Sequence, residues 1–559
     1  MKTRAQALVE LTSAGEPYEL IEVEQYGVMV RAFKNAPENL RVLFEESRSD
    51  ETFLVYEGER YSFEDTWQMA ARVARILTEE FEVVHGDRVA ISMRNYPEWV
   101  FAFMAVTSIG AIAVAMNALW TPDEMEYGLQ DSGAKVLFAD AERVARLAQT
   151  SGALSELKTV AVRCNGELAV NVVEFEQLIK RYPFNEMPAA QLHPKDDATI
   201  LYTSGSTGHP KGAVSCHRNI ISALLSWELD GRAAASVAGV EFPEPQAQPA
   251  ALLAVPLFHA TGSHAVFLSC FRAQRRLISM YKWDVSQAAE IIETERVSAF
   301  VAPAAMTGDL VQHAQSSNRD LSSLAMVGGG GAPRAPEQVR GIDKTFSNAM
   351  PNTGWGMTET NAIGTGIGGQ DYLDHPESSG RCSAVLDLRI VAEDGRELSA
   401  GERGELQVRG ASVIRGYWKR PDANAETFTD RWLRTGDVAY LDDEGFLFIV
   451  DRIKDLVIRG GENIGCGAVE AALLEHPQVV EASVYGVPDD RLGEEVATTV
   501  YVDGDPDENE LREFLAGRLA VFEIPRYIHF AAQRLPRIAS GKIFKRQLRE
   551  EATQRLANS

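Results

Sequence analysis

YTSGSTGHPKG, residues 202–212, is a loop of small and hydroxylated residues that ends in a cation, and it follows the apolar segment 197–202. We expect this segment to be a short buried strand. A Gly/Ser/Thr loop that leaves a strand presents backbone N–H groups and hydroxyls without bulky side chains, which suits polyphosphate oxygens. Lys211 adds a point charge for the phosphates. The loop therefore predicts a phosphate-binding site, and a flexible surface linker is the alternative.

The spacing of the loop differs from that of P-loop NTPases, which place four residues between two glycines and then continue with Gly-Lys-Ser/Thr. Here two residues separate Gly205 from Gly208, and a proline precedes Lys211. The P-loop class is therefore not indicated, and the type of nucleotide chemistry has to come from the rest of the chain.

The composition is that of an ordinary soluble globular protein, with 45% apolar and 24% charged residues. At 559 residues the chain is too long for one core, so two or more domains are expected. The net charge of −25 argues against a nucleic-acid partner. The five cysteines are dispersed without a CxxC pair, which favours a reducing compartment and no structural zinc.

The apolar run from Phe101 to Met116 is a candidate membrane span, but it is short, and Ser108-Ile-Gly110 interrupts it. A buried helix over 97–108 followed by a buried strand over 111–116 explains the run better. The N-terminus lacks an apolar segment of the signal-peptide type, and the C-terminus carries no peroxisomal tripeptide. We expect a cytoplasmic protein without a transmembrane segment.

The fold class expected from the pattern is α/β, because strand-like and helical segments alternate in the first part of the chain. After about residue 380, short β segments bounded by turns take over. A charged stretch, 451–455, directly follows one of these segments. We place the domain boundary at residues 451–455, which gives an N-terminal domain of residues 1–450 and a C-terminal domain of residues 456–559.

Two further motifs suit a nucleotide. NTGWGMTET, residues 352–360, is a turn that can lay an aromatic side chain against a purine and place a hydroxyl and a carboxylate near Mg²⁺. Asp437, in WLRTGD, follows a Thr-Gly turn and can accept two hydrogen bonds from ribose hydroxyls. The alternatives are a tight turn with a buried tryptophan and a capping aspartate.

The C-terminal part carries two more motifs. Asp451-Arg452 is followed by RGGENI, residues 459–464, and the basic tail contains LPRIASGKIFKR, residues 535–546. In this tail a Ser-Gly turn presents Lys542 on a short tip, which suits a cation that reaches into a site from outside. A solvated basic face is the alternative explanation.

Together these motifs resemble the adenylate-forming superfamily, which includes acyl-CoA synthetases, peptide-synthetase adenylation domains and beetle luciferases. The resemblance runs from about residue 50 to about residue 548, and YTSGSTGHPKG, GWGMTET, RTGD, DRIKD, GGEN and LPRIASGK all stand where the family has them. It implies a large N-terminal domain of stacked α/β sheets with a β-barrel-like subdomain, and a small mobile α+β C-terminal domain.

The resemblance implies a site for ATP and Mg²⁺. Trp355 would lie against adenine, and Asp437 and Arg452 would bind the ribose. Glu359 would hold Mg²⁺ with Thr358 assisting. The full set that it assigns to ATP or AMP is Thr203, Ser204, Gly205, Ser206, Thr207, Gly208, Lys211, Gly331, Ala332, Trp355, Gly356, Thr358, Asp437 and Arg452.

The resemblance also implies positions for the acid and for CoA. Lys542 would bridge the acyl carboxylate and the α-phosphate, and His259 would gate the acyl and pantetheine channels. Lys454 occupies the hinge position, within a hinge of residues 451–455. CoA would contact Arg459, Gly460 and Gly461, and the acyl pocket would be lined by Phe258, Val301, Gly329 and Gly330.

One segment departs from the family pattern. Where the family commonly has Asn-Ile-x-Pro-x-Glu-Val-Glu, this chain has Asn463-Ile-Gly-Cys-Gly-Ala-Val-Glu470, so Cys466 replaces the proline and Ala468 the first glutamate. The extra glycines should loosen the start of the following helix. Cys466 as a nucleophile is the alternative, but no base is assignable to it.

The implied reaction has two steps, formation of acyl-AMP from ATP and then transfer of the acyl group to a thiol. The leading hypothesis is an acyl-CoA ligase, because Gly460 and Gly461 leave room for a thin pantetheine arm. Alternatives are an adenylation enzyme that loads a separate carrier protein and a luciferase-type oxidase. A catalytically inactive nucleotide sensor would be expected to lack Glu359, Asp437 or Lys542, and all three are present.

Only the residues of the expected acyl pocket indicate which class of acid is the substrate. Four glycines at 328–331 predict a roomy, side-chain-poor wall, and further apolar lining comes from Phe258, Ala260, Val301, Ala302 and Met306. These segments offer no basic residue for a second carboxylate. We expect a medium- or long-chain fatty acid first and an aryl or alicyclic acid second. The small-molecule carboxylate and CoA are the expected partners, with self-association as a homodimer left open.

Overall fold

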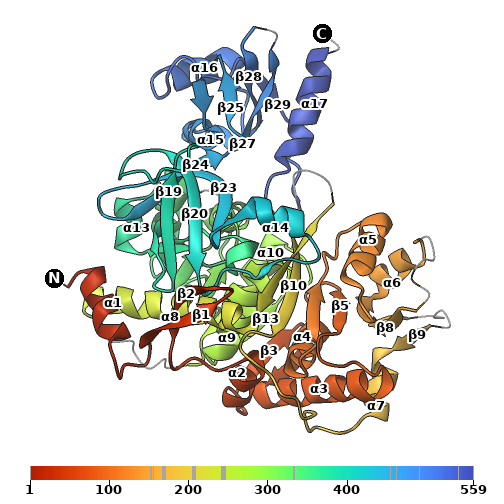
Figure 1. The fold of residues 1–559 in the computed structure, drawn as a ribbon. Coiled ribbons are helices and arrows are strands. Elements are labelled where there is room, and N and C mark those ends of the chain that lie inside the picture. The colour runs from red at the N-terminus through yellow and green to blue at the C-terminus, as the bar shows by residue number, and fades with distance from the viewer. Residues whose placement is uncertain are drawn as a thin grey trace.

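The computed structural model describes residues 2–557 except 151–153, 155, 166–170, 204–208, 241–246, 332–333, 454, 461, 490 and 539–540, and except the side chains of residues 463 and 557. The described chain forms a large lower part and a small upper part that carries the C-terminus (Figure 1). This is the α/β fold with a large N-terminal and a small C-terminal domain that the sequence predicts.

The first sheet of the large part is mostly parallel and has the strand order β21-β11-β10-β6-β5-β7-β8-β9. Its strands are β5 (Arg88–Ser92), β6 (Ile112–Ala115), β7 (Val136–Asp140), β8 (Lys158–Val162), β9 (Val172–Glu174), β10 (Asp197–Thr203), β11 (Lys211–Cys216) and β21 (Gly416–Tyr417). Strand β10 confirms the buried strand expected before the phosphate loop. The antiparallel pairing of β10 with β11 brings Thr203 and Lys211, the residues on either side of that loop, together.

The second sheet runs in the order β19-β20-β23-β24-β18-β17-β16-β15-β14-β12-β13-β3-β4, with β22 beside β23. Its strands are β3 (Thr52–Tyr56), β4 (Glu59–Ser62), β12 (Ala250–Leu253), β13 (Arg276–Ser279), β14 (Ala299–Val301), β15 (Met326–Gly328), β16 (Met350–Thr353), β17 (Thr365–Gly368), β18 (Gly380–Cys382), β19 (Leu386–Val391), β20 (Gly404–Gly410), β22 (Phe428–Thr429), β23 (Trp432–Leu441) and β24 (Phe446–Arg452). The β-rich region expected after residue 380 is its antiparallel end.

Helices cover both sheets and fill the space between them. They are α1 (Arg4–Thr12), α2 (Leu40–Glu46), α3 (Phe63–Arg75), η1 (Ile76–Glu80), α4 (Pro97–Ser108), α5 (Pro122–Ser132), α6 (Ala141–Leu147), α7 (Phe175–Arg181), α8 (His217–Ala238), η2 (Thr261–Leu268), α9 (Ser269–Arg272), α10 (Val285–Glu295), α11 (Ala304–Ser316), α12 (Pro336–Thr345), η3 (Thr358–Thr360), α13 (Gln370–Asp374) and α14 (Pro421–Thr427). A hairpin of β1 (Leu20–Gln25) and β2 (Val28–Phe33) follows α1.

Every residue of α4 is buried, and β6 follows it as a buried strand. This confirms the buried helix and strand expected in place of a membrane span. Among the helices that the structure describes, none is both long and apolar enough to cross a bilayer.

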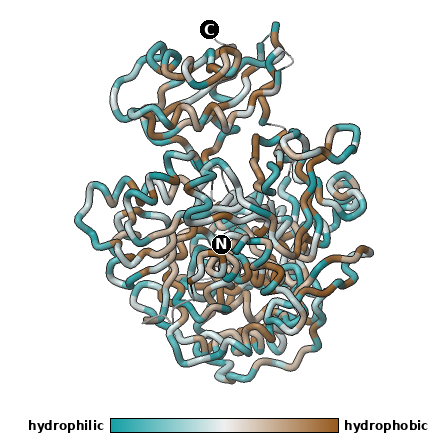
Figure 2. Tube along the Cα trace, turned by 90° about the vertical axis from the view of Figure 1, so that its left-hand side faces the viewer, coloured by the Kyte–Doolittle hydropathy of each residue, from teal (hydrophilic) through white to brown (hydrophobic). Residues whose placement is uncertain are grey.

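The C-terminal part is a small α+β unit whose sheet is mainly antiparallel. It consists of β25 (Val457–Arg459), β26 (Glu462–Ile464), α15 (Cys466–Leu474), β27 (Val479–Asp489), β28 (Gly493–Val502), α16 (Glu508–Ala516), β29 (Tyr527–Phe530) and α17 (Lys545–Ala557). Figure 2 shows hydrophobic segments in the large part and again in this unit. One buried apolar cluster draws residues from Val30 to Leu447, and a second draws them from Val457 to Ile528, so each part has a core of its own.

Candidate active site

One continuous cavity of about 2720 Å³ is lined by residues of both parts of the chain. It brings together a large share of the predicted site: Thr203, Lys211, His259, Val301, Gly329, Gly330, Gly331, Trp355, Gly356, Thr358, Glu359, Asp437, Arg452 and Lys542. Eight other predicted residues lie outside the described residues, namely Ser204, Gly205, Ser206, Thr207, Gly208, Ala332, Lys454 and Gly461.

The two ends of the phosphate loop meet in the β10–β11 hairpin. Thr203 pairs with Lys211 in the antiparallel ladder, and the Thr203 hydroxyl donates to the Lys211 carbonyl at 3.3 Å. The Lys211 Nζ lies 5.3 Å from the centre of the Tyr417 ring. The pairing thus holds the two ends of the loop together, and Thr203 and Lys211 line the cavity.

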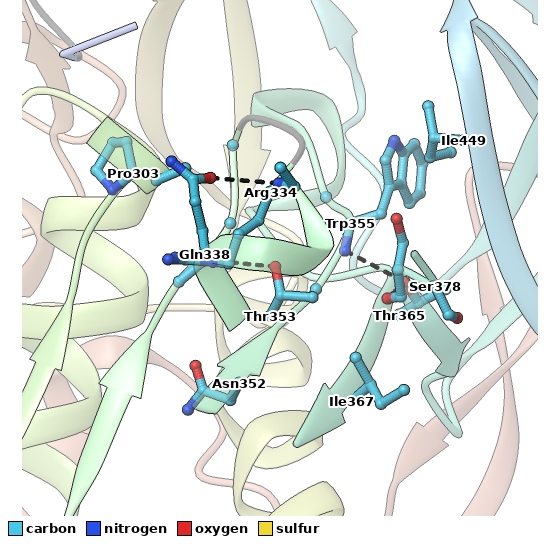
Figure 3. Close-up of a pocket in the computed structure, with 18 of the residues that line it drawn as sticks. Pro303, Arg334, Gln338, Asn352, Thr353, Trp355, Thr365, Ile367, Ser378 and Ile449 are labelled. Atoms are coloured by element: carbon cyan, nitrogen blue, oxygen red, sulfur yellow. Dashed lines mark hydrogen bonds between the residues drawn. The ribbon is translucent and has the colours of Figure 1, made fainter. Parts of the chain in front are cut away.

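A tryptophan from the turn after β16, an aspartate within β23 and an arginine at the end of β24 form one hydrogen-bonded group. Trp355 Nε1 donates to Asp437 Oδ2 at 2.7 Å, and Arg452 Nε lies 2.7 Å from Asp437 Oδ1. Asp437 is buried, and burial raises the pKa of its carboxyl, against the opposing effect of the Arg452 charge. Figure 3 shows the Trp355 indole beside Ile449. The group places an aromatic face and a carboxylate at the same wall of the cavity.

Glu359, the predicted metal ligand, is buried in the short helix η3. The hydroxyl of Tyr417 donates to Glu359 Oε1 at 2.7 Å, and burial together with the Glu359 charge raises the pKa of the Tyr417 phenol. Sequence reasoning missed Tyr417. Its role depends on the pairing of β21 with β11, which joins segments about two hundred residues apart and leaves no local signal in the sequence.

Lys542 reaches the cavity from the C-terminal part. A methyl group placed on Gly331 would lie 3.5 Å from Lys542 Cε and 3.8 Å from Nζ. Burial and the nearby Arg452 lower the pKa of Lys542, while Asp437 opposes the shift. Burial and the Lys542 charge also lower the pKa of His259 to about 4. His259 is therefore neutral at neutral pH, and none of the described residues forms a hydrogen bond with its buried Nε2.

The glycines at 328–330 have a different function from the roomy wall that the sequence suggests. A methyl group on Gly328 would lie 2.0 Å from Asn352 Oδ1, and one on Gly329 would lie 2.5 Å from the Ala302 carbonyl oxygen. One on Gly330 would lie 2.5 Å from the Gly354 carbonyl oxygen. These glycines allow backbones to approach closely. Of the four, Gly331 is the one that faces Lys542.

Three predicted residues are not on the large cavity. Phe258 lines a separate cavity of about 240 Å³ that it shares with Met306 and Gly541. Arg459 forms an ion pair with Glu495 inside the C-terminal part, and Gly460 donates its N–H to the Leu492 carbonyl at 2.8 Å. In this arrangement Lys542 lines the cavity, whereas Arg459 and Gly460, the residues expected to contact CoA, do not.

Cys466 begins α15 and is fully buried. Its thiol donates to the Asp455 carbonyl at 3.2 Å, and its N–H donates to Asp451 Oδ2 at 2.5 Å. Burial raises the pKa of the thiol. A neutral, buried thiol with a structural hydrogen bond is not an activated nucleophile, so Cys466 packs the start of the helix.

The site fits a magnesium ion that is held mainly by a nucleotide. Among the described residues no group of three or more histidine, cysteine or acidic side chains could hold a metal ion by itself. Mg²⁺ on a nucleotide takes one or two protein carboxylates and completes its shell with phosphates and water. Glu359 and the Thr358 hydroxyl, both on the cavity, suffice for that kind of site.

The fold and this site define a class of protein. The family model of the AMP-binding enzymes matches residues 44–418, more than half of the chain, and that of the AMP-binding enzyme C-terminal domain matches residues 468–542. The chain belongs to this family, which confirms the resemblance noted in the sequence and the predicted enzyme class, an AMP-forming acid–thiol ligase.

The names of the relatives refer to different acids. The chain is 32% identical to the long-chain-fatty-acid–CoA ligase FadD13 of Mycobacterium tuberculosis, over 86% of this chain and 91% of the relative. It is 33% identical to a feruloyl-CoA synthase of an Amycolatopsis species, over 86% and 92%. The structure of Bacillus subtilis o-succinylbenzoate CoA synthetase with its acyl-adenylate intermediate matches with a TM-score of 0.76 at 28% identity, over 91% of this chain and 98% of that one. The family therefore fixes the chemistry and leaves the acid open.

Proposed function

We propose that this protein is an ATP-dependent acyl-CoA ligase that activates an apolar monocarboxylic acid, first of all a medium- or long-chain fatty acid and secondly an aryl or alicyclic acid. The observation that carries the proposal is the position of Lys542, which lies against Gly331 in the same cavity as Asp437, Arg452 and Glu359. The proposal includes Mg²⁺ as the metal and a cytoplasmic location.

In the first step a carboxylate oxygen of the acid attacks the α-phosphorus of ATP, and the bond from that phosphorus to the pyrophosphate oxygen breaks. Lys542 neutralises charge on the acyl carboxylate and the α-phosphate, and Lys211 neutralises charge on the leaving pyrophosphate. Mg²⁺, when bound, supplies further charge neutralisation at Glu359 and Thr358. Asp437 and Arg452 fix the ribose, so that the reacting atoms are held in line.

In the second step the sulfur of CoA attacks the acyl-AMP carbonyl carbon, the bond to the AMP oxygen breaks, and AMP and the thiol proton are released. Arg459 and Gly460 would approach the site for this step after rotation of the C-terminal domain about Lys454, which would withdraw Lys542. His259 stays neutral at neutral pH because of its lowered pKa, so it presents no charge to a passing pantetheine arm.

A separate carrier protein in place of CoA is the second candidate, because the same first step serves either thiol. The test is carboxylate-dependent AMP release across a panel of straight-chain, aryl and alicyclic acids, with and without CoA. Formation of a CoA thioester with at least one acid supports the proposal. Acyl-AMP and pyrophosphate formation without any CoA thioester would favour the carrier protein, and no pyrophosphate release with any acid would overturn both.

A further inference from the structure

The N-terminal helix α1 is fastened along α8 by polar contacts. Arg4 Nη2 lies 2.6 Å from Asp230 Oδ1, and Lys2 Nζ donates to the Ser236 hydroxyl at 3.0 Å. Figure 1 shows α1 against one end of α8. The start of α1 is therefore held in one position relative to α8, and Arg4 with it.

Arg4 and Asp230 both line the large cavity, together with Thr3. Two glycines in close contact with their neighbours, Gly354 and Gly366, link this pair to the predicted adenylate site. A methyl group on Gly354 would lie 2.4 Å from the Thr365 carbonyl oxygen, and one on Gly366 would lie 3.6 Å from Asp230 Oδ2. Because Gly354 directly precedes Trp355, the carboxylate of Asp230 stands one strand away from the nucleotide-binding turn. Besides Arg4 and Asp230, the cavity lining contributed by α8 includes Trp227 and the small side chains of Ala234 and Ala235.

The ion pair is mostly shielded but not closed off from the cavity, since the side chains of Arg4 and Asp230 are 17% and 16% exposed. The second oxygen of Asp230 accepts from the Ser383 hydroxyl at 3.0 Å. Burial raises the pKa of Asp230, and Arg4 opposes that shift. Among the described residues, no group accepts a hydrogen bond from Nε or Nη1 of Arg4. Because Nε is itself buried, the donor capacity that the pair keeps for a ligand lies on Nη1.

A plain hydrocarbon end against this wall would displace water from a charged pair without replacing its hydrogen bonds, which is costly. A hydroxyl or carbonyl oxygen can accept from Arg4, and a hydroxyl can also donate to Asp230. A second carboxylate fits less well, because Asp230 already uses the charge of Arg4 and would repel another anion.

We propose that Arg4 and Asp230 form a polar specificity subsite for a neutral oxygen group, a hydroxyl or a carbonyl, on the part of the acid remote from the reacting carboxylate. The inference rests on the proposed function and sharpens it, because the preferred acid is then oxygenated as well as largely apolar. Arg4 acts through binding of the acid and takes no part in the chemical steps.

The test compares matched acids. Straight-chain acids from hexanoic to hexadecanoic acid are paired with their ω-hydroxy counterparts, and cinnamic acid with its para-hydroxy counterpart, and kcat/KM for AMP release is measured for each. We expect at least one oxygenated acid to be preferred over its partner by about tenfold or more, as for a hydrogen bond to a charged group. The Arg4→Met enzyme should lose that preference, with the change mainly in KM and with the plain acid affected less than about threefold.

Lys2→Met is the matched control, because Lys2 also fastens α1 to α8 but does not line the cavity. It should keep the preference, and thermal unfolding should show that both variants fold. Equal kcat/KM for the two members of every pair, or an unchanged preference in Arg4→Met, would overturn the subsite and leave the ligase function standing. AMP release with none of the acids would instead contradict the proposed function itself.

Discussion

Asp437 and Arg452 pair across the β23–β24 ladder, with 2.7 Å between Asp437 Oδ1 and Arg452 Nε. The aspartate side chain is 4% exposed and the arginine side chain 44%, so the charge of the arginine is largely hydrated while that of the aspartate is not. Burial consequently outweighs the pairing, and the pKa of Asp437 is raised. Ionisation of Asp437, the residue that we expect to bind the ribose, therefore lowers the stability of the folded state.

The first prediction is that Asp437→Asn stabilises the fold while it weakens nucleotide binding. Because the carboxyl pKa is raised in the native protein, the unfolded chain loses this proton at lower pH than the native protein does. The free energy of unfolding therefore falls as pH rises from the unfolded-state pKa to the native-state pKa, and it stays lower above both. The variant escapes this loss, its amide oxygen can still accept from Trp355, and the partly exposed pair with Arg452 that it gives up is worth at most about 1 kcal/mol. Thermal unfolding should show a higher midpoint for the variant at neutral pH.

The same experiment has a pH signature. The advantage of Asp437→Asn should shrink as pH falls through the raised pKa and vanish below the ordinary aspartate range, because the wild-type carboxyl is then neutral in both states. Calorimetric titration with ATP at neutral pH should show weaker binding to the variant. A variant that is less stable than wild type at neutral pH would contradict the assigned cost of burial.

The second prediction concerns Tyr417, which orients the expected metal ligand. Tyr417→Phe removes the hydrogen bond to Glu359 and leaves the ring beside Lys211 in place. A hydrogen bond to a charged group contributes about 1.5–3 kcal/mol, so we expect the apparent affinity for Mg²⁺ in the AMP-release assay to fall by about tenfold or more. High Mg²⁺ should restore much of the rate.

Tyr485→Phe is the control for this prediction, since Tyr485 is also buried and hydrogen-bonded, to Thr499, but lies in the C-terminal part. It should leave the Mg²⁺ dependence unchanged. A Tyr417→Phe enzyme with normal Mg²⁺ dependence and a lower rate at every concentration would show that Tyr417 does not act through the metal site.

The features that the sequence predicts correctly are those with a local pattern. The strand before the phosphate loop and the buried helix over 97–108 follow from apolar runs and their breakers, and both occur as β10 and α4. Trp355, Asp437 and Lys542, which are predicted to contact the nucleotide, also belong to short recognisable motifs, and the fold brings them to one cavity.

The features that sequence reasoning missed arise from contacts between distant segments. Tyr417 reaches Glu359 because β21 pairs with β11, and Arg4 reaches Asp230 because α1 lies on α8. Neither partner can be inferred from spacing along the chain. The glycines at 328–330 illustrate the same limit, because a run of glycines indicates missing side chains but not whether the space is open or filled by another backbone.

The third prediction separates the two half-reactions. Lys542→Ala should lower acyl-AMP formation by about a hundredfold or more, the usual effect of removing a group that stabilises developing charge. It should still convert premade acyl-AMP and CoA into thioester at close to the wild-type rate. Arg546→Ala, in the same basic tail but exposed, is the control and should change neither step. Equal loss of both half-reactions would contradict the assignment of Lys542 to the first step alone.

The fourth prediction concerns the contacts that hold Lys542 in the cavity. Arg534 of the C-terminal part donates to Asp309 Oδ1 at 2.7 Å and to Gln312 Oε1 at 2.8 Å, both on α11 of the large part. Arg534→Ala should shift the population away from this arrangement and slow acyl-AMP formation severalfold, since a half-exposed pair contributes up to about 1 kcal/mol. Thioester formation from premade acyl-AMP should be unchanged or faster. Arg518→Ala, which breaks an ion pair within the C-terminal part, is the matched control and should affect neither rate. Slowing of both half-reactions by Arg534→Ala would show that the contact supports the fold and does not select between two domain positions.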